Sequence, residues 1–228
     1  MTSKNQLIKT EKDGLFKAIR SDGRTYHIRQ DRHRYFYPDE WNTFYSNVYP
    51  KHKLLFETLI QSGARISEAL NIRPMDLDYE RNTLTLVVTK SKAKKGQTKE
   101  TGGARRSFQV SSDYIKHVRK YTKENDILDN NKIFNLSDAT ASFALRKGLI
   151  RAGIKDYYNF SLHNIRKTHG MWLKTLIPYS REITEGEICL RLGHDMNTFL
   201  KHYGSPSIFA ERDKIMMIKI LGDIYGLR

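Results

Sequence analysis

A change of sequence period near residue 83 constrains the fold of this chain more than any other feature. The run Thr83-Leu84-Thr85-Leu86-Val87-Val88 is rich in β-branched residues, and residues 107–110 form the expected partner strand. Before and after this pair, apolar residues recur at helical spacing. The sequence therefore predicts a mostly α-helical α+β fold with one small antiparallel β-sheet.

Proline, glycine and capping residues mark the ends of several predicted helices. Pro38-Asp39-Glu40 places a proline in a first helical turn and acids at the positive end of the helix dipole. Pro50 starts a second helix that Gly63 ends, and Thr184 with Glu187 forms a capping box before a later one. The expected helices cover residues 38–48, 50–62, 67–72, 114–121, 140–152, 164–176, 188–192 and 207–225.

The first 33 residues differ from the rest in being polar and basic with few, irregularly spaced apolar residues. A turn at Asp22-Gly23 separates two short apolar runs. We interpret residues 1–33 as an extension or arm, either a small hairpin or a flexible tail, and residues 34–228 as the domain that carries the core.

Charge is the most informative part of the composition. The chain of 228 residues has 40 Lys and Arg against 25 Asp and Glu, a formal net charge of +15. Such a surface favours a polyanionic partner, nucleic acid first, although a purely solubilising surface is the alternative. No apolar run approaches the ~20 residues of a membrane span, and no signal peptide is evident. Cys189 is the only cysteine, which excludes an internal disulfide and favours an intracellular, cytoplasmic location.

Two short motifs pair a cation with a second functional group one helical turn away. In Ala64-Arg65-Ile66-Ser67-Glu68 a carboxylate can fix the direction of a guanidinium, as bidentate phosphate recognition requires, or can form an ordinary surface pair. His163 and Arg166 combine a group that titrates near neutrality with a permanent cation; a capping histidine beside a solvated arginine is the alternative. The histidine spacings do not match a zinc motif.

A basic connection spans residues 90–106, between the two predicted strands. Lys90 closes the first strand, and a hairpin tip of this charge suits a DNA groove or backbone, unless it is only a solvated loop. The candidate DNA-binding residues in it are Lys92, Lys94, Lys95, Lys99, Arg105 and Arg106.

The run from residue 192 to residue 204 contains Leu192-Gly193-His194 and, nine residues after the histidine, Tyr203. Gly204, Ser205 and Pro206 stop a helix, so Tyr203 is expected on its last turn, where a phenol can reach out of the core. A tyrosine that only packs at a helix end is the alternative.

Taken together, these motifs resemble the tyrosine recombinase (phage integrase) family over residues 35–215. The resemblance rests on the order and spacing of the Arg65 box, Lys90, the His163-x-x-Arg166 box and Leu192-Gly193-His194 followed by Tyr203. It implies that Arg65, Arg166 and His194 hold the scissile phosphate and that Tyr203 attacks it. It also implies that Lys90, or Lys92 in its place, is the general acid, that His163 assists proton transfer and that Glu68 is structural support.

The resemblance further implies double-stranded DNA as partner, self-association into dimers or tetramers on DNA, and no metal or cofactor. The helix after Tyr203 would then pack either on a neighbouring protomer or on its own core. A core-binding domain of about a hundred residues usually precedes the catalytic domain, so the chain is either a minimal recombinase or a fragment. A type IB topoisomerase-like relaxing enzyme and a catalytically silent DNA-binding protein are the rival functions. Target site, source, biological outcome, and cis or trans donation of the tyrosine stay open.

Overall fold

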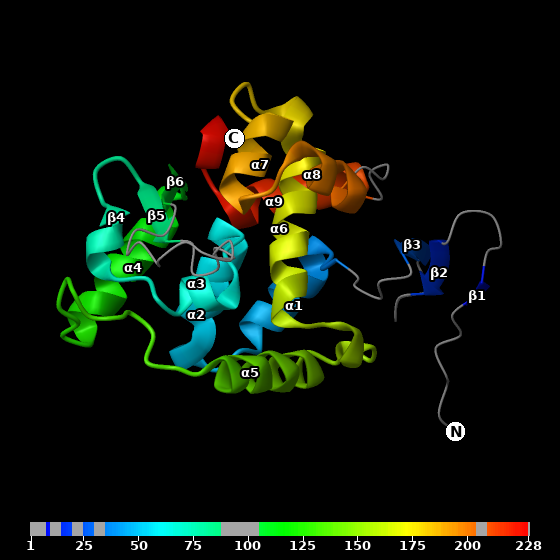
Figure 1. Ribbon diagram of the computed structural model, residues 1–228. Helices are drawn as coiled ribbons and strands as arrows, with labels where there is room; N and C mark the ends of the chain where they lie inside the picture. Colours follow the sequence, from blue (N-terminus) through cyan, green and yellow to red (C-terminus); the bar gives the residue numbers. More distant parts are fainter. Residues whose placement is uncertain are drawn as a thin grey trace, which may run out of the picture.

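The computed structural model describes residues 35–87, 105–203 and 209–227, together with the backbone of three strands nearer the N-terminus. It is mostly α-helical with a small antiparallel sheet, which confirms the predicted fold class (Figure 1). The elements in chain order are β1 (Ile8–Lys9), β2 (Leu15–Ile19), β3 (Thr25–Arg29), α1 (Pro38–Ser46), α2 (Pro50–Ser62), α3 (Ile66–Ala69), η1 (Pro74–Asp76), β4 (Leu77–Asp78), β5 (Thr83–Val87), β6 (Arg105–Gln109), α4 (Ser112–Glu124), α5 (Asp138–Arg151), η2 (Tyr157–Asn159), α6 (Leu162–Leu176), η3 (Ile177–Tyr179), α7 (Glu185–Leu192), α8 (Met196–Tyr203), α9 (Glu211–Leu221) and η4 (Ile224–Gly226).

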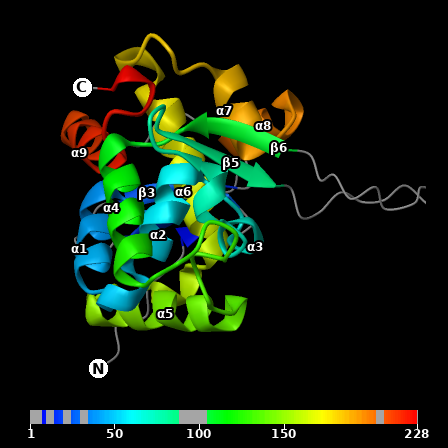
Figure 2. The same ribbon diagram turned by 90° about the vertical axis from the view of Figure 1, so that its left-hand side faces the viewer.

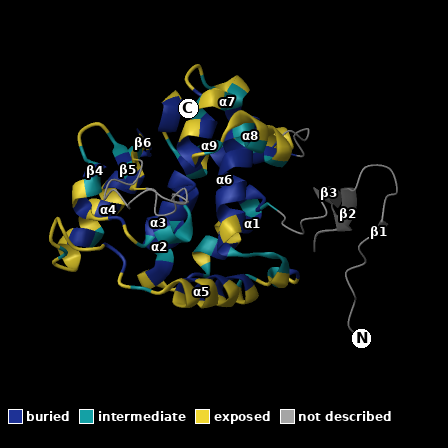
Figure 3. Ribbon diagram, viewed as in Figure 1, coloured by how far each residue is buried: buried dark blue, intermediate teal, exposed yellow. Residues whose placement is uncertain are grey.

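Helix α6 is the centre of the core. It packs against α2, α5, α7, α8 and α9, and most of its residues are buried (Figure 3). The segment before α1 is fixed to it, because Thr168 Oγ1 accepts from Phe36 N at 2.9 Å and Trp172 Nε1 donates to Phe36 O at 3.1 Å. The chemistry-bearing residues of α6 are therefore held by a helix that is supported on several sides.

The sheet beside this core has the order β4-β5-β6 and is antiparallel throughout. Leu84 is paired with Phe108 and Leu86 with Arg106, and the three apolar side chains of these pairs are buried. Strand β6 packs against α7, and the two lie side by side in Figure 2. Strand β4 has only two residues and was not predicted from the sequence.

The N-terminal strands form a second antiparallel sheet, of order β1-β2-β3. Strand β2 pairs with β3, with Ile19 opposite Thr25; the predicted turn at Asp22-Gly23 lies outside the described residues. Of the two alternatives for residues 1–33 the strand pairing corresponds to the hairpin, with β1 as an additional strand, and their role as an arm stays a prediction.

Local capping explains why several helix boundaries were predictable. Glu40 accepts a hydrogen bond from Tyr37 N at 3.1 Å, and Gly63 ends α2 with a left-handed φ of 62°. Ser111 and Thr184 cap α4 and α7 through their side chains, each contributing about 1 kcal/mol. The third helix is shorter than predicted and ends at Ala69 instead of residue 72.

The C-terminal helix packs on its own chain, against α1 and α6. Met217 and Leu221 are fully buried there, and α9 ends four residues before Tyr225, the expected limit. The sequence left open whether this helix packs on a neighbouring protomer or on its own core, and in this structure it packs on its own core. No helix in the described part of the chain combines the length and the apolar character needed to cross a membrane.

Candidate active site

Arg65 and Glu68 form the first part of the site, at the start of α3. Arg65 Nη1 donates to Glu68 Oε1 at 2.9 Å, and the backbone N–H of Arg65 donates to Oε2 at 2.8 Å. The Glu68 side chain is 1% exposed and that of Arg65 is 35% exposed. The carboxylate is thus an internal support that directs a partly exposed guanidinium, rather than one half of an ordinary surface pair.

Arg106 reaches the same carboxylate from β6. Its Nη2 lies 2.6 Å from Glu68 Oε2 and its Nη1 lies 3.3 Å from Oε1. Burial raises the pKa of Glu68, but the hydrogen bonds from Arg106 and Arg65 outweigh it and hold the pKa below its ordinary value. The prediction that Arg105 and Arg106 belong to the basic loop is wrong in its placement, because both are strand residues.

Arg166 lies on α6 and connects the other two segments of the site. Its Nη1 donates to Gly63 O at 2.7 Å, and its Nη2 donates to Leu192 O and lies 3.1 Å from His194 Nε2. Burial, and then the charge of Arg65, lowers the pKa of Arg166 to about 10. Burial, and then Arg166 and Arg65, lowers the pKa of His194 to about 3, so its imidazole is neutral at pH 7.

Three donors in this region have no hydrogen-bond partner among the described residues. They are Nε of Arg106, Nε of Arg166 and Nδ1 of His194, and all three atoms are buried. Buried donors are normally satisfied. A region that gathers unsatisfied donors and three guanidinium groups around a single carboxylate favours an anion.

Tyr203 is the last residue of α8, as predicted, but it does not reach outward. It is 1% exposed, and its ring lies over Gly170 of α6, where an added Cβ would be 2.8 Å from Tyr203 Cε1 and Cζ. The rings of His194 and Tyr203 have centroids 6.3 Å apart. Burial raises the pKa of Tyr203 to about 12, although the charge of Arg166 opposes this. The expectation of an exposed phenol is therefore wrong for this arrangement.

The remaining predicted residues divide into two groups. His163 is exposed at the start of α6, and its charge is among the causes of the lowered His194 pKa, so the two histidines lie within electrostatic range of each other. Lys90, Lys92, Lys94, Lys95 and Lys99 lie outside the described residues. The structure thus brings together Arg65, Glu68, His163, Arg166, His194 and Tyr203, from four separate segments.

A buried arginine behind the site was missed in the sequence. Arg191 of α7 donates from Nε to His169 Nε2 at 2.9 Å, from Nη1 to Gln109 O at 2.7 Å and to Tyr225 Oη at 3.1 Å, and from Nη2 to Gln61 O. It therefore joins α7 to α6, β6, α2 and the C-terminal segment. Its only sequence signal is its place one residue before Leu192, which does not distinguish it from a surface arginine.

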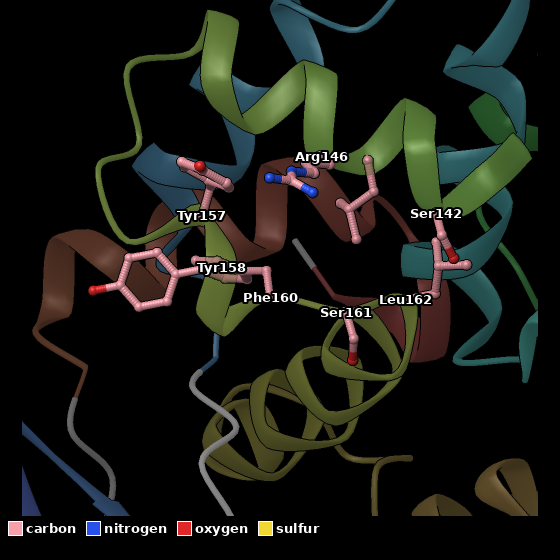
Figure 4. A pocket seen from close by; sticks show the side chains of 8 residues that line it. Ser142, Arg146, Tyr157, Tyr158, Phe160, Ser161 and Leu162 are labelled. Carbon is pink, nitrogen blue, oxygen red and sulfur yellow. The ribbon is translucent and has the colours of Figure 1, made fainter. Parts of the chain in front are cut away.

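A separate pocket of about 340 Å³ lies between α5 and the start of α6 (Figure 4). The guanidinium of Arg146 lies 5.4 Å from the ring centroid of Tyr157 at this pocket. No residue of the candidate site lines it; its lining residues are Ser142, Leu145, Arg146, Tyr157, Tyr158, Phe160, Ser161 and Leu162. Among the described residues, no group of three or more His, Cys, Asp or Glu side chains could hold a metal ion.

The chain belongs to the phage integrase family, whose model matches residues 34–203. Solved structures with the same fold include XerA recombinase, with 16% identity over 82% of this chain and a TM-score of 0.59. The catalytic domain of bacteriophage HP1 integrase has 16% identity over 77% of this chain, 90% of that domain and a TM-score of 0.53.

XerH site-specific recombinase bound to difH substrate has 17% identity over 83% of this chain and a TM-score of 0.58. The chain spans only 64% of the XerA structure and 56% of the XerH structure, so it corresponds to part of their length. Comparison with curated protein sequences gives no match.

Proposed function

We propose that this chain is a site-specific DNA recombinase that cleaves and rejoins DNA strands through a 3′-phosphotyrosyl intermediate, in integration or excision of a mobile element. The observation that carries the proposal is the convergence of Arg65, Arg166 and His194, from three segments, beside the ring of Tyr203. Double-stranded DNA as partner is supported by the net charge of +15 and by the XerH structure, which is bound to its difH substrate.

The electrostatics of the site suit a transferring phosphoryl group. Arg65 and Arg106 contact the buried carboxylate of Glu68, and Arg166 is within its electrostatic range, so three cations are opposed by one acid. Charge that develops on the oxygens of a pentacoordinate transition state would be stabilised by these cations. One well-placed donor of this kind contributes about 3–4 kcal/mol to such a barrier.

The proposed step conserves atoms and electrons. The phenolic oxygen of Tyr203 attacks phosphorus, the bond from phosphorus to the 5′ oxygen breaks, and the 5′ oxygen takes a proton from Lys90, with Lys92 as the second choice. His163 assists removal of the phenol proton. The tyrosyl phosphodiester retains the bond energy, so the 5′-hydroxyl of a new strand can reverse the step without a nucleotide cofactor.

Access to Tyr203 requires a movement of α8 in this proposal, because Tyr203 and Arg166 are each 1% exposed. Hydrogen bonds that hold the end of α8 include those from Lys174 Nζ to Tyr203 O and from Tyr35 Oη to His202 O, the latter at 3.0 Å. Gly193, with φ of 57°, joins α7 to α8. We propose that DNA binding, with assembly of protomers on DNA, releases α8 from α6.

Residues 34–228 would carry this chemistry and residues 1–33 would be a basic arm, in a protein that acts on intracellular DNA. A type IB topoisomerase-like enzyme would use the same site, and it would relax supercoils without recombinant product. A silent DNA-binding protein would bind DNA and form no adduct.

The test is a nicked DNA substrate from which the cleaved oligonucleotide diffuses away, so that the covalent complex accumulates. The wild-type chain is expected to give a denaturant-resistant protein–DNA adduct, and Tyr203→Phe to give none while binding DNA with similar affinity. Tyr114→Phe is the matched control, because Tyr114 is also 1% exposed and its hydroxyl lies 3.0 Å from Thr58 Oγ1, with no residue of the site as partner. An adduct formed by Tyr203→Phe would overturn the assignment.

A further inference from the structure

Arg106 is placed differently from the adjacent arginine of β6, Arg105. Its side chain is 10% exposed and makes both contacts to Glu68, whereas its neighbour Arg105 is exposed on the strand. Alternate residues of a strand point to opposite faces, so the two arginines belong to opposite faces of β6. Only Arg106 faces the candidate site.

The two oxygens of Glu68 are each shared between the two arginines. Oε1 accepts from Nη1 of both Arg65 and Arg106, and Oε2 accepts from the Arg65 backbone N–H and from Arg106 Nη2. A bidentate guanidinium holds a carboxylate in one plane. The direction in which Glu68 holds Arg65 therefore depends on Arg106.

Arg106 also touches the turn that presents His194. A Cβ built on Gly193 would lie 3.1 Å from Arg106 Nη1 and 3.7 Å from its Cζ, so the guanidinium lies against the backbone directly before the histidine. Nε of Arg106 has no partner among the described residues, although it is buried. One side chain thus contacts both the α3 segment and the turn between α7 and α8.

We propose that Arg106 is a positioning residue of the phosphate site: it holds Glu68, and through it the Arg65 guanidinium, and it supports the turn that presents His194. This inference rests on the proposed function. It differs from a role in the basic loop, because a loop residue would act through DNA affinity. Since β6 also continues from the basic connection, Arg106 would link the base of that hairpin to the catalytic arginine.

The experiment compares single-turnover cleavage of the nicked substrate at saturating DNA by Arg106→Gln, Arg106→Lys and the control Arg81→Gln, whose side chain is 84% exposed on the turn before β5. Arg106→Gln is expected to slow cleavage by about 100-fold, the order of magnitude that misplacing a reacting group costs, with DNA affinity within about twofold of wild type. Arg106→Lys keeps the positive charge but not the two-pronged guanidinium, so its cleavage rate should lie between those of wild type and Arg106→Gln. Arg81→Gln should cleave at the wild-type rate, because its side chain is exposed and lies outside the candidate site. Wild-type cleavage by Arg106→Gln, or recovery at high DNA concentration, would overturn the proposal.

A double variant tests the route through Glu68. If Arg106 acts through Glu68, Arg106→Gln combined with Glu68→Gln should cost no more than the larger single loss; multiplied losses would contradict this. Arg106→Gln leaves the buried Glu68 carboxylate without one of its two arginine partners, and the double variant removes that charge. The double variant is therefore expected to fold even if Arg106→Gln does not. If Arg106→Gln does not fold, the cleavage rate of Arg106→Lys is the deciding measurement, and a full wild-type rate would overturn the proposal.

A readout independent of cleavage separates this inference from the proposed function. The side-chain Nε–H resonance of Arg65, assigned with Arg65→Lys, should shift in Arg106→Gln and not in Arg81→Gln. An unshifted resonance in Arg106→Gln would overturn the positioning role. Failure of the wild-type chain to form any adduct, with the resonance shifted as expected, would count against the proposed function alone.

Discussion

Arg166 Nη2 lies 3.1 Å from His194 Nε2, and this contact determines which tautomer the histidine adopts. A guanidinium can only donate hydrogen bonds, so His194 must accept at Nε2 and carry its proton on Nδ1. The Nδ1 atom is buried and has no partner among the residues that the structure describes. His194 is therefore a neutral donor, able to present an N–H to a phosphate oxygen.

The lowered pKa of His194 leads to a prediction about how its side chain titrates. The pKa of His194 is lowered to about 3, so its ring nitrogen resonances should stay those of a neutral Nδ1–H imidazole between pH 5 and 8. Nitrogen NMR of the histidine side chains, assigned with His194→Asn, is the measurement. Titration of His194 with a midpoint between pH 6 and 7 would contradict the contact with Arg166.

The lowered pKa of His194 also determines whether the free energy of unfolding rises or falls with pH. Below pH 6.5 the unfolded chain takes up a proton on this histidine, whereas the folded chain does not until about pH 3. The free energy of unfolding should therefore fall as pH drops through that window. His169, whose pKa burial and then Arg191 lower well below the ordinary value, contributes in the same direction.

Gly170→Ala tests the packing of Tyr203 on α6. The added Cβ would lie 2.8 Å from Tyr203 Cε1 and from Leu192 Cδ1, so the ring must move. We expect a loss of about 1–3 kcal/mol in the free energy of unfolding, measured in urea, together with faster adduct formation if α8 must open.

Gly186→Ala is the control for that change, because the nearest atom to its Cβ would be Thr184 Oγ1 at 3.6 Å. It should be neutral or stabilise α7 by less than about 1 kcal/mol. Equal effects of the two substitutions would show that the Tyr203 ring is not packed against Gly170.

Arg191→Lys tests the buried arginine behind the site. Lysine cannot reach His169, Gln109 O and Tyr225 Oη together, so acceptors are left unsatisfied around a buried charge. The free energy of unfolding should fall by about 3 kcal/mol or more. Arg212→Lys, at a side chain 64% exposed, should change it by less than about 0.5 kcal/mol. A small effect of Arg191→Lys would mean that the network does not stabilise the fold.

Replacing Lys94, Lys95 and Lys99 with Gln tests the basic connection, which was predicted as a DNA contact from the sequence alone. DNA affinity should fall for all sequences, and the dependence of log affinity on log salt should become shallower by up to about three. The charge-matched control replaces Lys116, Lys120 and Lys123 of α4. An unchanged salt dependence would remove the connection from the DNA interface.

Much of the fold was predictable because its signals are local. Two helix starts and one helix end follow from the backbone geometry of single residues, Pro38, Pro50 and Gly63. The change of sequence period near Thr83 indicates a strand directly. The short helix that ends at Tyr203 follows from the residues after it. Strand β4 was missed because two residues carry no period.

The sequence picked out residues that the fold brings together, but it did not predict how they are arranged, and their catalytic roles stay predictions. Burial of the Tyr203 ring depends on its packing against Gly170, which is distant in sequence. Arg106 was read as a loop residue because arginine does not signal a strand. Its contact with Glu68 exists only once β6 and α3 are together.

The most direct test of the central claim is to map the covalent bond. After trapping and digestion with trypsin, cleavage at Lys201 and Arg212 releases the peptide 202–212, in which Tyr203 is the only tyrosine. Mass spectrometry should find this peptide attached through a phosphate to the 3′ end of the cleaved strand, with a free 5′-hydroxyl on the other product. A nucleotide on any other peptide, or on the 5′ end, would contradict the account.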